Sequence, residues 1–127
     1  MNKNTIRAEL AALCRLALRG LDTLPNATPE IKALKQKVRG EIARLMRRVV
    51  TMPEERLTAP RGSYHKYCGV FKRNSSGNYD YEAGARVLEI TWLIFTIELG
   101  LGYTDEDEHS LAAIDLKVAF DELDFPD

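Results

Sequence analysis

Residues 28–53, TPEIKALKQKVRGEIARLMRRVVTMP, carry the clearest helix signal in the chain and decide its fold class. Thr28 can cap a helix, Pro29 suits its first position, and Glu30 lies near the positive end of the helix dipole. Apolar residues then recur every three or four positions until Pro53 ends the pattern: Ile31, Leu34, Val38, Ile42, Leu45, Val49 and Met52. The stretch predicts a helix over 29–52 with one buried face, about 36 Å long.

The segment before this helix has the same kind of periodicity. Its apolar residues are spaced by four, three, four and four positions: Ile6, Leu10, Leu13, Ala17 and Leu21. This spacing predicts a helix over 5–21. Because only a short turn separates it from Thr28, the helices over 5–21 and 29–52 are predicted to form an antiparallel hairpin. Cys14 lies beside the apolar stripe, so we expect it to be a small core residue.

Residues 82–99 predict a third helix that is apolar over most of its circumference. Such a helix is expected to lie at the centre of the fold. Its β-branched residues make a buried strand the alternative, but Glu82, Glu89 and Thr96 fall one heptad apart on a single polar edge, which favours a helix.

The last predicted helix spans 105–123, after Gly100 and Gly102 end the third and Thr104 offers a cap. The chain is therefore predicted to be all-α, a single domain over 1–127 with a four-helix bundle built from two helical hairpins. Between the second and third helices lies a long loop, 53–81, whose turn-forming residues leave open a small β-hairpin pairing 64–72 with 78–81.

Size and composition set the class of protein. With 127 residues, 45% of them apolar and 29% charged, the chain is long enough to bury a core and unlike a disordered or fibrous protein. Cys14 and Cys68 suit neither a disulfide framework nor a cysteine metal site, which favours a reducing compartment. The most apolar stretch, 87–101, contains Glu89 and Glu98 and is shorter than the roughly 20 residues that span a bilayer. We expect a cytoplasmic protein without a membrane partner.

Charge is sorted by position along the chain. Residues 1–73 hold sixteen Lys and Arg against six Asp and Glu, whereas residues 74–127 hold two against thirteen. The halves therefore carry net charges of about +10 and −11, which cancel in the whole chain. Such a division provides a basic surface, an acidic surface, or an internal contact between the two.

The basic residues are the first candidate site for a binding partner. They comprise Lys32, Lys35, Arg39, Arg44, Arg47 and Arg48 of the basic helix and Arg61, Tyr64, His65, Lys66, Tyr67, Lys72 and Arg73 of the loop. The helix has a charge density that suits a phosphate backbone, and the loop alternates aromatic and basic side chains as single-stranded nucleic-acid sites do. On a helical wheel, however, the cations flank both sides of the apolar face, where they can equally serve packing within the fold.

An acidic stripe is the second candidate. Glu108, Asp115 and Glu122 are seven residues apart, with apolar residues on both sides of the line that they form. Carboxylates between apolar flanks are expected to face protein and to need cationic partners. The basic flanks of 29–52, in the same chain or in a second copy, are the expected donors.

Catalytic patterns are weak. Glu106 and His109 match one Glu-x-x-His pair of a carboxylate metal bundle, which needs two such pairs, and His65 with Cys68 lacks a third orienting group. No phosphate loop, nucleophile elbow or zinc spacing is present, so we assign no catalytic residue, metal or cofactor.

The sequence therefore predicts a binding or regulatory protein. Protein–protein interaction or self-association is the first interpretation, because opposite charges on a small domain favour steered assembly. Nucleic-acid binding is the first alternative, an acidic inhibitor or immunity protein that imitates nucleic acid is the second, and a metal-dependent helical-bundle enzyme, using Glu82 and Glu89 with the Glu106/His109 pair, is the third.

Overall fold

The structure, a computed structural model, describes residues 3–59, 79–103 and 110–122. Its elements are α1 (Lys3–Thr23), α2 (Pro29–Thr51), the short 3-10 helix η1 (Glu54–Arg56), α4 (Tyr79–Gly100) and α5 (Leu111–Asp121). Within those three ranges there is no strand. The predicted all-α class is confirmed.

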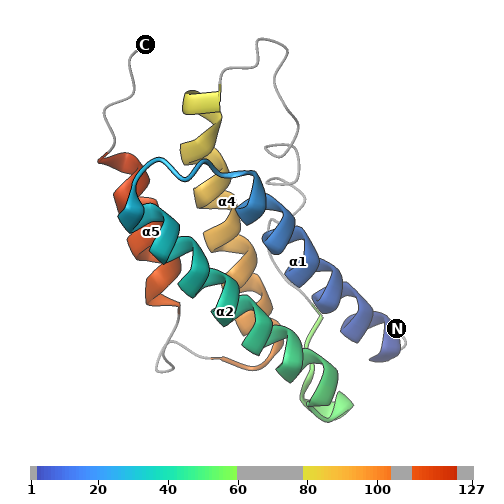
Figure 1. The fold of residues 1–127 in the computed structure, drawn as a ribbon. Helices are drawn as coiled ribbons and strands as arrows, with labels where there is room; N and C mark the ends of the chain where they lie inside the picture. The colour runs from blue at the N-terminus through green and yellow to red at the C-terminus, as the bar shows by residue number, and fades with distance from the viewer. Residues whose placement is uncertain (1–2, 60–78, 104–109, 123–127) are drawn as a thin grey trace.

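Each long helix packs side by side with two others (Figure 1). α1 contacts α2 and α4, and α5 contacts the same two helices from the other side. Neighbouring helices run antiparallel, so α1 and α5 point one way and α2 and α4 the other. Two of the four packed pairs, α1 with α4 and α2 with α5, join helices from different halves of the sequence.

The core lies between these helices and is almost wholly aliphatic. It takes the predicted faces of α1 and α2, including Leu10, Cys14, Val38 and Ile42, each with no exposed surface. The expectation that Cys14 is a core residue is confirmed, and burial raises the pKa of its thiol to about 11. No helix in the described part of the chain has the length and hydrophobicity needed to cross a membrane.

The predicted helix 29–52 is confirmed almost residue for residue. The Thr28 hydroxyl accepts a hydrogen bond from the Ile31 amide at 3.1 Å, and Pro29 occupies the first position. Arg7 of α1 holds the other end of α2. Its guanidinium donates to the carbonyl oxygens of Val49 and Val50 at 2.7 and 2.8 Å, and to the carbonyl oxygen of Met52 at 3.1 Å. These carbonyls have no partner within their own helix, so α1 supplies their hydrogen bonds.

The last helix begins later than predicted. The sequence offered Thr104 as the cap of a helix over 105–123, but α5 begins at Leu111, and Ser110 caps it by accepting a hydrogen bond from the Ala113 amide at 3.3 Å. The prediction failed because two residues with capping side chains lie six positions apart and both satisfy local rules. Residues 104–109 lie outside the described part of the chain.

The long loop also differs from the prediction at both ends. η1 adds a helical turn after α2, and α4 begins at Tyr79, so the proposed second strand over 78–81 is wrong. The first strand of that hairpin, 64–72, lies outside the described residues. The segment leaving η1 is attached to the end of α4, because the Thr58 amide donates to the Gly100 carbonyl at 2.8 Å.

Candidate interaction surfaces

The polarity of α4 is opposite to that of an ordinary surface helix. Its polar residues between 86 and 98 are buried: Arg86, Glu89, Thr91, Thr96 and Glu98. Its exposed residues from 86 to 101 are all apolar: Leu88, Trp92 and Leu99. The expectation of a helix at the centre of the fold is wrong, because α4 packs against two main neighbours and turns one side to solvent.

The buried polar groups of α4 are mostly satisfied by backbone acceptors. Thr91 and Thr96 donate to the carbonyl oxygens four residues earlier, at 2.9 and 2.8 Å. Arg86 donates to the carbonyl of Thr23 in α1 at 3.2 Å. Two members of the predicted polar edge, Glu89 and Thr96, are therefore part of the interior, and the side chain of the third, Glu82, lies outside the described part of the structure.

The exposed side of α4 forms a continuous apolar row that we call the α4 stripe: Leu88, Trp92, Phe95 and Leu99. Leu88 is 40% exposed, Trp92 45% and Leu99 50%, and the half-buried Phe95 ring meets Trp92 edge to face, with centroids 6.3 Å apart. Spacings of four, three and four residues place all four on one side of the helix. Among the described residues of α4, no charged side chain interrupts this side.

A second apolar row lies on the outer side of α5, and we call it the α5 stripe: Leu111, Ile114 and Val118. All three are exposed, Leu111 by 68%. The core side of α5 is instead formed by Ala112, Ala113, Leu116, Ala119 and Phe120. One of the two apolar flanks seen on the helical wheel is thus buried and the other faces outward.

This arrangement corrects the expected position of the acidic stripe. Asp115 and Glu122 are exposed, and neither forms an ion pair with a described cation of α2. They share a shallow groove with Glu30 and Leu34 of α2. The predicted neutralisation within the chain is absent there because an acidic residue of α2, not a basic one, lies opposite. Glu108 lies outside the described residues.

Three of the six predicted cations of α2 serve contacts within the chain. The buried Lys35 ammonium donates to the Leu24 carbonyl at 2.6 Å and to Asn26 Oδ1 at 2.9 Å. Its burial, with Arg39 nearby, lowers the pKa of Lys35. Arg39 pairs with Asp22 at the end of α1. Lys35 therefore serves packing within the fold, one of the two roles that the sequence left open for these cations, and is not available to a partner.

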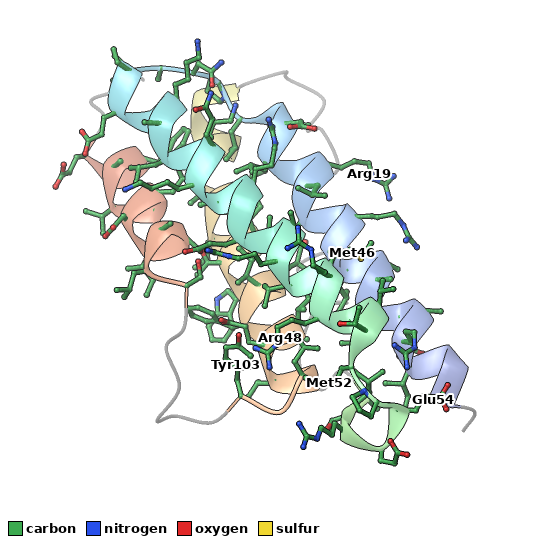
Figure 2. The ribbon with its side chains drawn as sticks, turned by 60° about the horizontal axis from the view of Figure 1, so that its bottom comes forward. Arg19, Met46, Arg48, Met52, Glu54 and Tyr103 are labelled. Atoms are coloured by element: carbon green, nitrogen blue, oxygen red, sulfur yellow. The ribbon has the colours of Figure 1, made fainter. Side chains whose placement is uncertain are left out.

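Arg48 is the third of these cations. It hydrogen-bonds to the Tyr103 hydroxyl and lies over that ring, with its guanidinium carbon 5.0 Å from the centroid. Figure 2 shows the two side chains meeting beyond the end of α4. Together with Glu41, Arg44 and Ser110 they border a pocket of about 300 Å³ where α5 begins. Ser110 also hydrogen-bonds to the Glu41 carboxylate, so the pocket is lined by both cations and carboxylates.

The remaining cations form a basic face on α1 and α2 that is open to solvent. Its members are Arg15 and Arg19 of α1 and Lys32, Lys37, Arg44 and Arg47 of α2. Arg44 has a loose contact with Glu41 at 3.9 Å, and the other five have no ion pair with any described residue. Figure 2 shows Arg19 extending away from the helices. Sequence reasoning missed Arg15 and Arg19, although their four-residue spacing places them together on one side of α1.

Glu89 stands apart from these surfaces. Its side chain is completely buried, and its two carboxylate oxygens have no hydrogen-bond partner within the described residues. Burial raises the pKa of Glu89 to about 8, so the carboxyl group is mainly protonated at neutral pH. A protonated, enclosed carboxyl is a poor metal ligand.

The residues predicted from the loop, Arg61, Tyr64, His65, Lys66, Tyr67, Lys72 and Arg73, lie outside the described part of the chain, as do Cys68, Glu106 and His109. Over the parts that are described, no three His, Cys, Asp or Glu side chains cluster in a way that could hold a metal ion.

Comparison with known proteins adds no relative: no protein-family model matches the chain, and no curated protein or solved structure matches it significantly.

Proposed function

We propose that the protein works by binding another protein chain through the α4 stripe, with the α5 stripe extending the contact. The observation that carries this proposal is the polarity of α4, whose charged residues from 86 to 98 are buried while Leu88, Trp92 and Leu99 face outward. In a helix whose outer side meets only water, the opposite arrangement is favourable.

The size of the apolar surface supports the same proposal. At roughly 100 Å² for each half-exposed large side chain, the two stripes present on the order of 600 Å², the upper end of what a typical monomer leaves open. Trp92 supplies the kind of large, rigid anchor that dominates the energetics of protein interfaces.

A photoreactive amino acid tests the proposal in cells that produce the protein. We would place it at Leu99 and, as a matched control, at Val50, which is 60% exposed near the end of α2. Position 99 should yield a discrete covalent adduct and position 50 none. Equal labelling from both positions, or no adduct from position 99, would overturn the proposal.

Nucleic-acid binding is the second candidate, and it rests on the basic face. Five of its six cations have no carboxylate partner among the described residues, so they remain available to phosphates. Binding of a duplex and of a single strand should weaken steeply with added salt and should fall when Arg19 and Arg47 are changed to Gln. Binding that does not respond to salt, or none at low salt, would reject this candidate.

Two further functions, an acidic mimic of nucleic acid and a metal enzyme, have weaker support. The mimic needs many exposed carboxylates, but Glu89 and Glu98 are buried, and of the acidic side chains that the structure describes in the second half only Asp115 and Glu122 are exposed. A metal enzyme centred on Glu89 would need that carboxyl deprotonated and accessible.

At the level of architecture, we propose one domain whose four helices form two antiparallel hairpins. The antiparallel packing of α1 with α2 and of α4 with α5 supports this arrangement.

A further inference from the structure

Resting on the proposed function, we infer that the partner of the α4 stripe is a second copy of this chain, and that two α4 helices pack antiparallel across a two-fold axis near Trp92 and Phe95. The inference combines the chemistry of the stripe, the placement of charge around it and the area that it offers.

The stripe is chemically self-complementary. All four of its members are apolar, and no charged side chain lies on the outer side of α4 between residues 86 and 101. Two copies can therefore approach without like-charge repulsion at the centre of the contact. A partner recognised by charge would find nothing to pair with there, whereas a second stripe offers matching apolar side chains.

Spacing makes the antiparallel arrangement specific. Members at 88, 92, 95 and 99 repeat by four, three and four residues, the pattern of a helix seam whose side chains interdigitate with those of a partner helix. Reversing the direction of the second copy leaves this order unchanged. Leu88 then meets the second copy's Leu99, and Trp92 meets the second copy's Phe95.

The charged surfaces lie where such a dimer needs them. The basic face is on α1 and α2, which pack on the inner side of α4 and α5, so it points away from the axis in both copies. Asp115 and Glu122 border the groove between α5 and α2, which places them at the rim of the contact. The strongest like charges are thus kept apart.

The area suits a weak, reversible dimer. At roughly 100 Å² for each member, the α4 stripe offers on the order of 400 Å² of apolar surface, about half of the 800 Å² or so per partner in a standard interface. We therefore expect a concentration-dependent dimer rather than an obligate one.

Sedimentation velocity on the purified full chain, over a roughly thousand-fold dilution series, tests the inference. The native chain should shift from dimer to monomer on dilution. Leu99→Lys should stay monomeric, whereas Val50→Lys should behave as the native chain does. Both positions are about half exposed in the last turns of their helices, where a cation suits the dipole. Circular dichroism confirms that both variants are folded.

Cysteine cross-linking tests the direction of the two helices. In a Cys68→Ser background, a mixture of Leu88→Cys and Leu99→Cys chains should form a disulfide-linked dimer, and neither variant alone should do so. In the antiparallel dimer, position 88 of one copy lies beside position 99 of the other. The two copies of position 88 are then about 16 Å apart, as are the two copies of position 99, which is farther than a disulfide can reach. Cross-linking of each variant only with itself would overturn the antiparallel arrangement.

A monomer at every concentration overturns the inference as a whole. If position 99 nevertheless yields a photo-adduct with a different protein in cells, the proposed function stands and only the identity of the partner is wrong. If position 99 yields no adduct either, both fail.

Discussion

Changing Glu89 to Gln should stabilise the protein at neutral pH and remove part of its pH dependence. The substitution keeps the shape of a completely buried side chain but removes its ability to ionise. Burial raises the pKa of the Glu89 carboxyl from an ordinary value of 4.5 to about 8 in the folded protein. The folded protein therefore keeps a proton on this group between pH 4.5 and pH 8.

The sign of the effect follows from proton binding. Between pH 4.5 and pH 8 the folded protein holds the Glu89 proton and the unfolded chain loses it. The free energy of unfolding therefore falls as the pH rises, by a little over 1 kcal/mol for each pH unit. At pH 7 the accumulated loss is about 3 kcal/mol relative to pH 4.5, and it is absent below that pH, where both states are protonated.

Urea unfolding followed by circular dichroism at several pH values between 4.5 and 8 measures this difference. The stability of Glu89→Gln minus that of the native chain should increase with pH, reaching about 3 kcal/mol at pH 7. Glu122→Gln, an exposed change on α5, is the matched control and should show no such trend. If the native chain and Glu89→Gln depend on pH identically, the raised pKa of Glu89 is wrong.

Three further changes probe the fold. Gly100→Ala should lower the free energy of unfolding in urea by about 1–3 kcal/mol, because a Cβ there would lie 2.5 Å from Leu10 Cδ2. The control Gly40→Ala has open space around it and should raise the free energy of unfolding by about 0.5–1 kcal/mol. Equal effects of the two substitutions would refute this packing. Arg7→Met should lower the free energy of unfolding by about 1–3 kcal/mol, because three carbonyls at the end of α2 lose their hydrogen-bond donor. An unchanged free energy of unfolding would show that water replaces the Arg7 guanidinium. Burial raises the pKa of Cys14 to about 11, so its thiol should be alkylated only as fast as the native chain unfolds. Mass spectrometry of the modified peptides follows this rate. Rapid labelling of Cys14 would contradict its burial.

Local rules were sufficient for the first two helices. Thr28 and Pro29 specify where α2 starts by hydrogen bonding and backbone geometry within a few residues, and the apolar repeat identifies the side that becomes buried. The same wheel correctly separated the cations into two flanks: Arg39 reaches toward α1, whereas Arg48 reaches toward Tyr103.

Prediction failed where apolar residues surround a helix. The sequence of α4 is apolar nearly all round, so its periodicity cannot tell which side a neighbour covers, and we expected the helix to be central. In the structure Glu89 and Thr96 are buried, whereas Leu88 and Trp92 are exposed. Which side is buried is a property of the whole packing, and no local pattern in α4 contains it.

The same reason explains the acidic stripe of α5. Two apolar flanks border Asp115 and Glu122, and the sequence could not show that only one of them meets the core. The candidate sites changed accordingly, from a basic helix facing an acidic one to an apolar face on α4 and α5 and a basic face on α1 and α2.

The pairing of α1 with α4 and of α2 with α5 has a consequence for a chain that has been cut. A break within residues 60–78 would leave two helical hairpins, each exposing the side that it normally buries against the other. The fragments would also carry opposite net charges, so their encounter would be accelerated by long-range attraction and slowed by salt. We therefore expect the two halves, made as separate polypeptides, to recombine into the native arrangement, which would make this small protein a natural starting point for a split reporter.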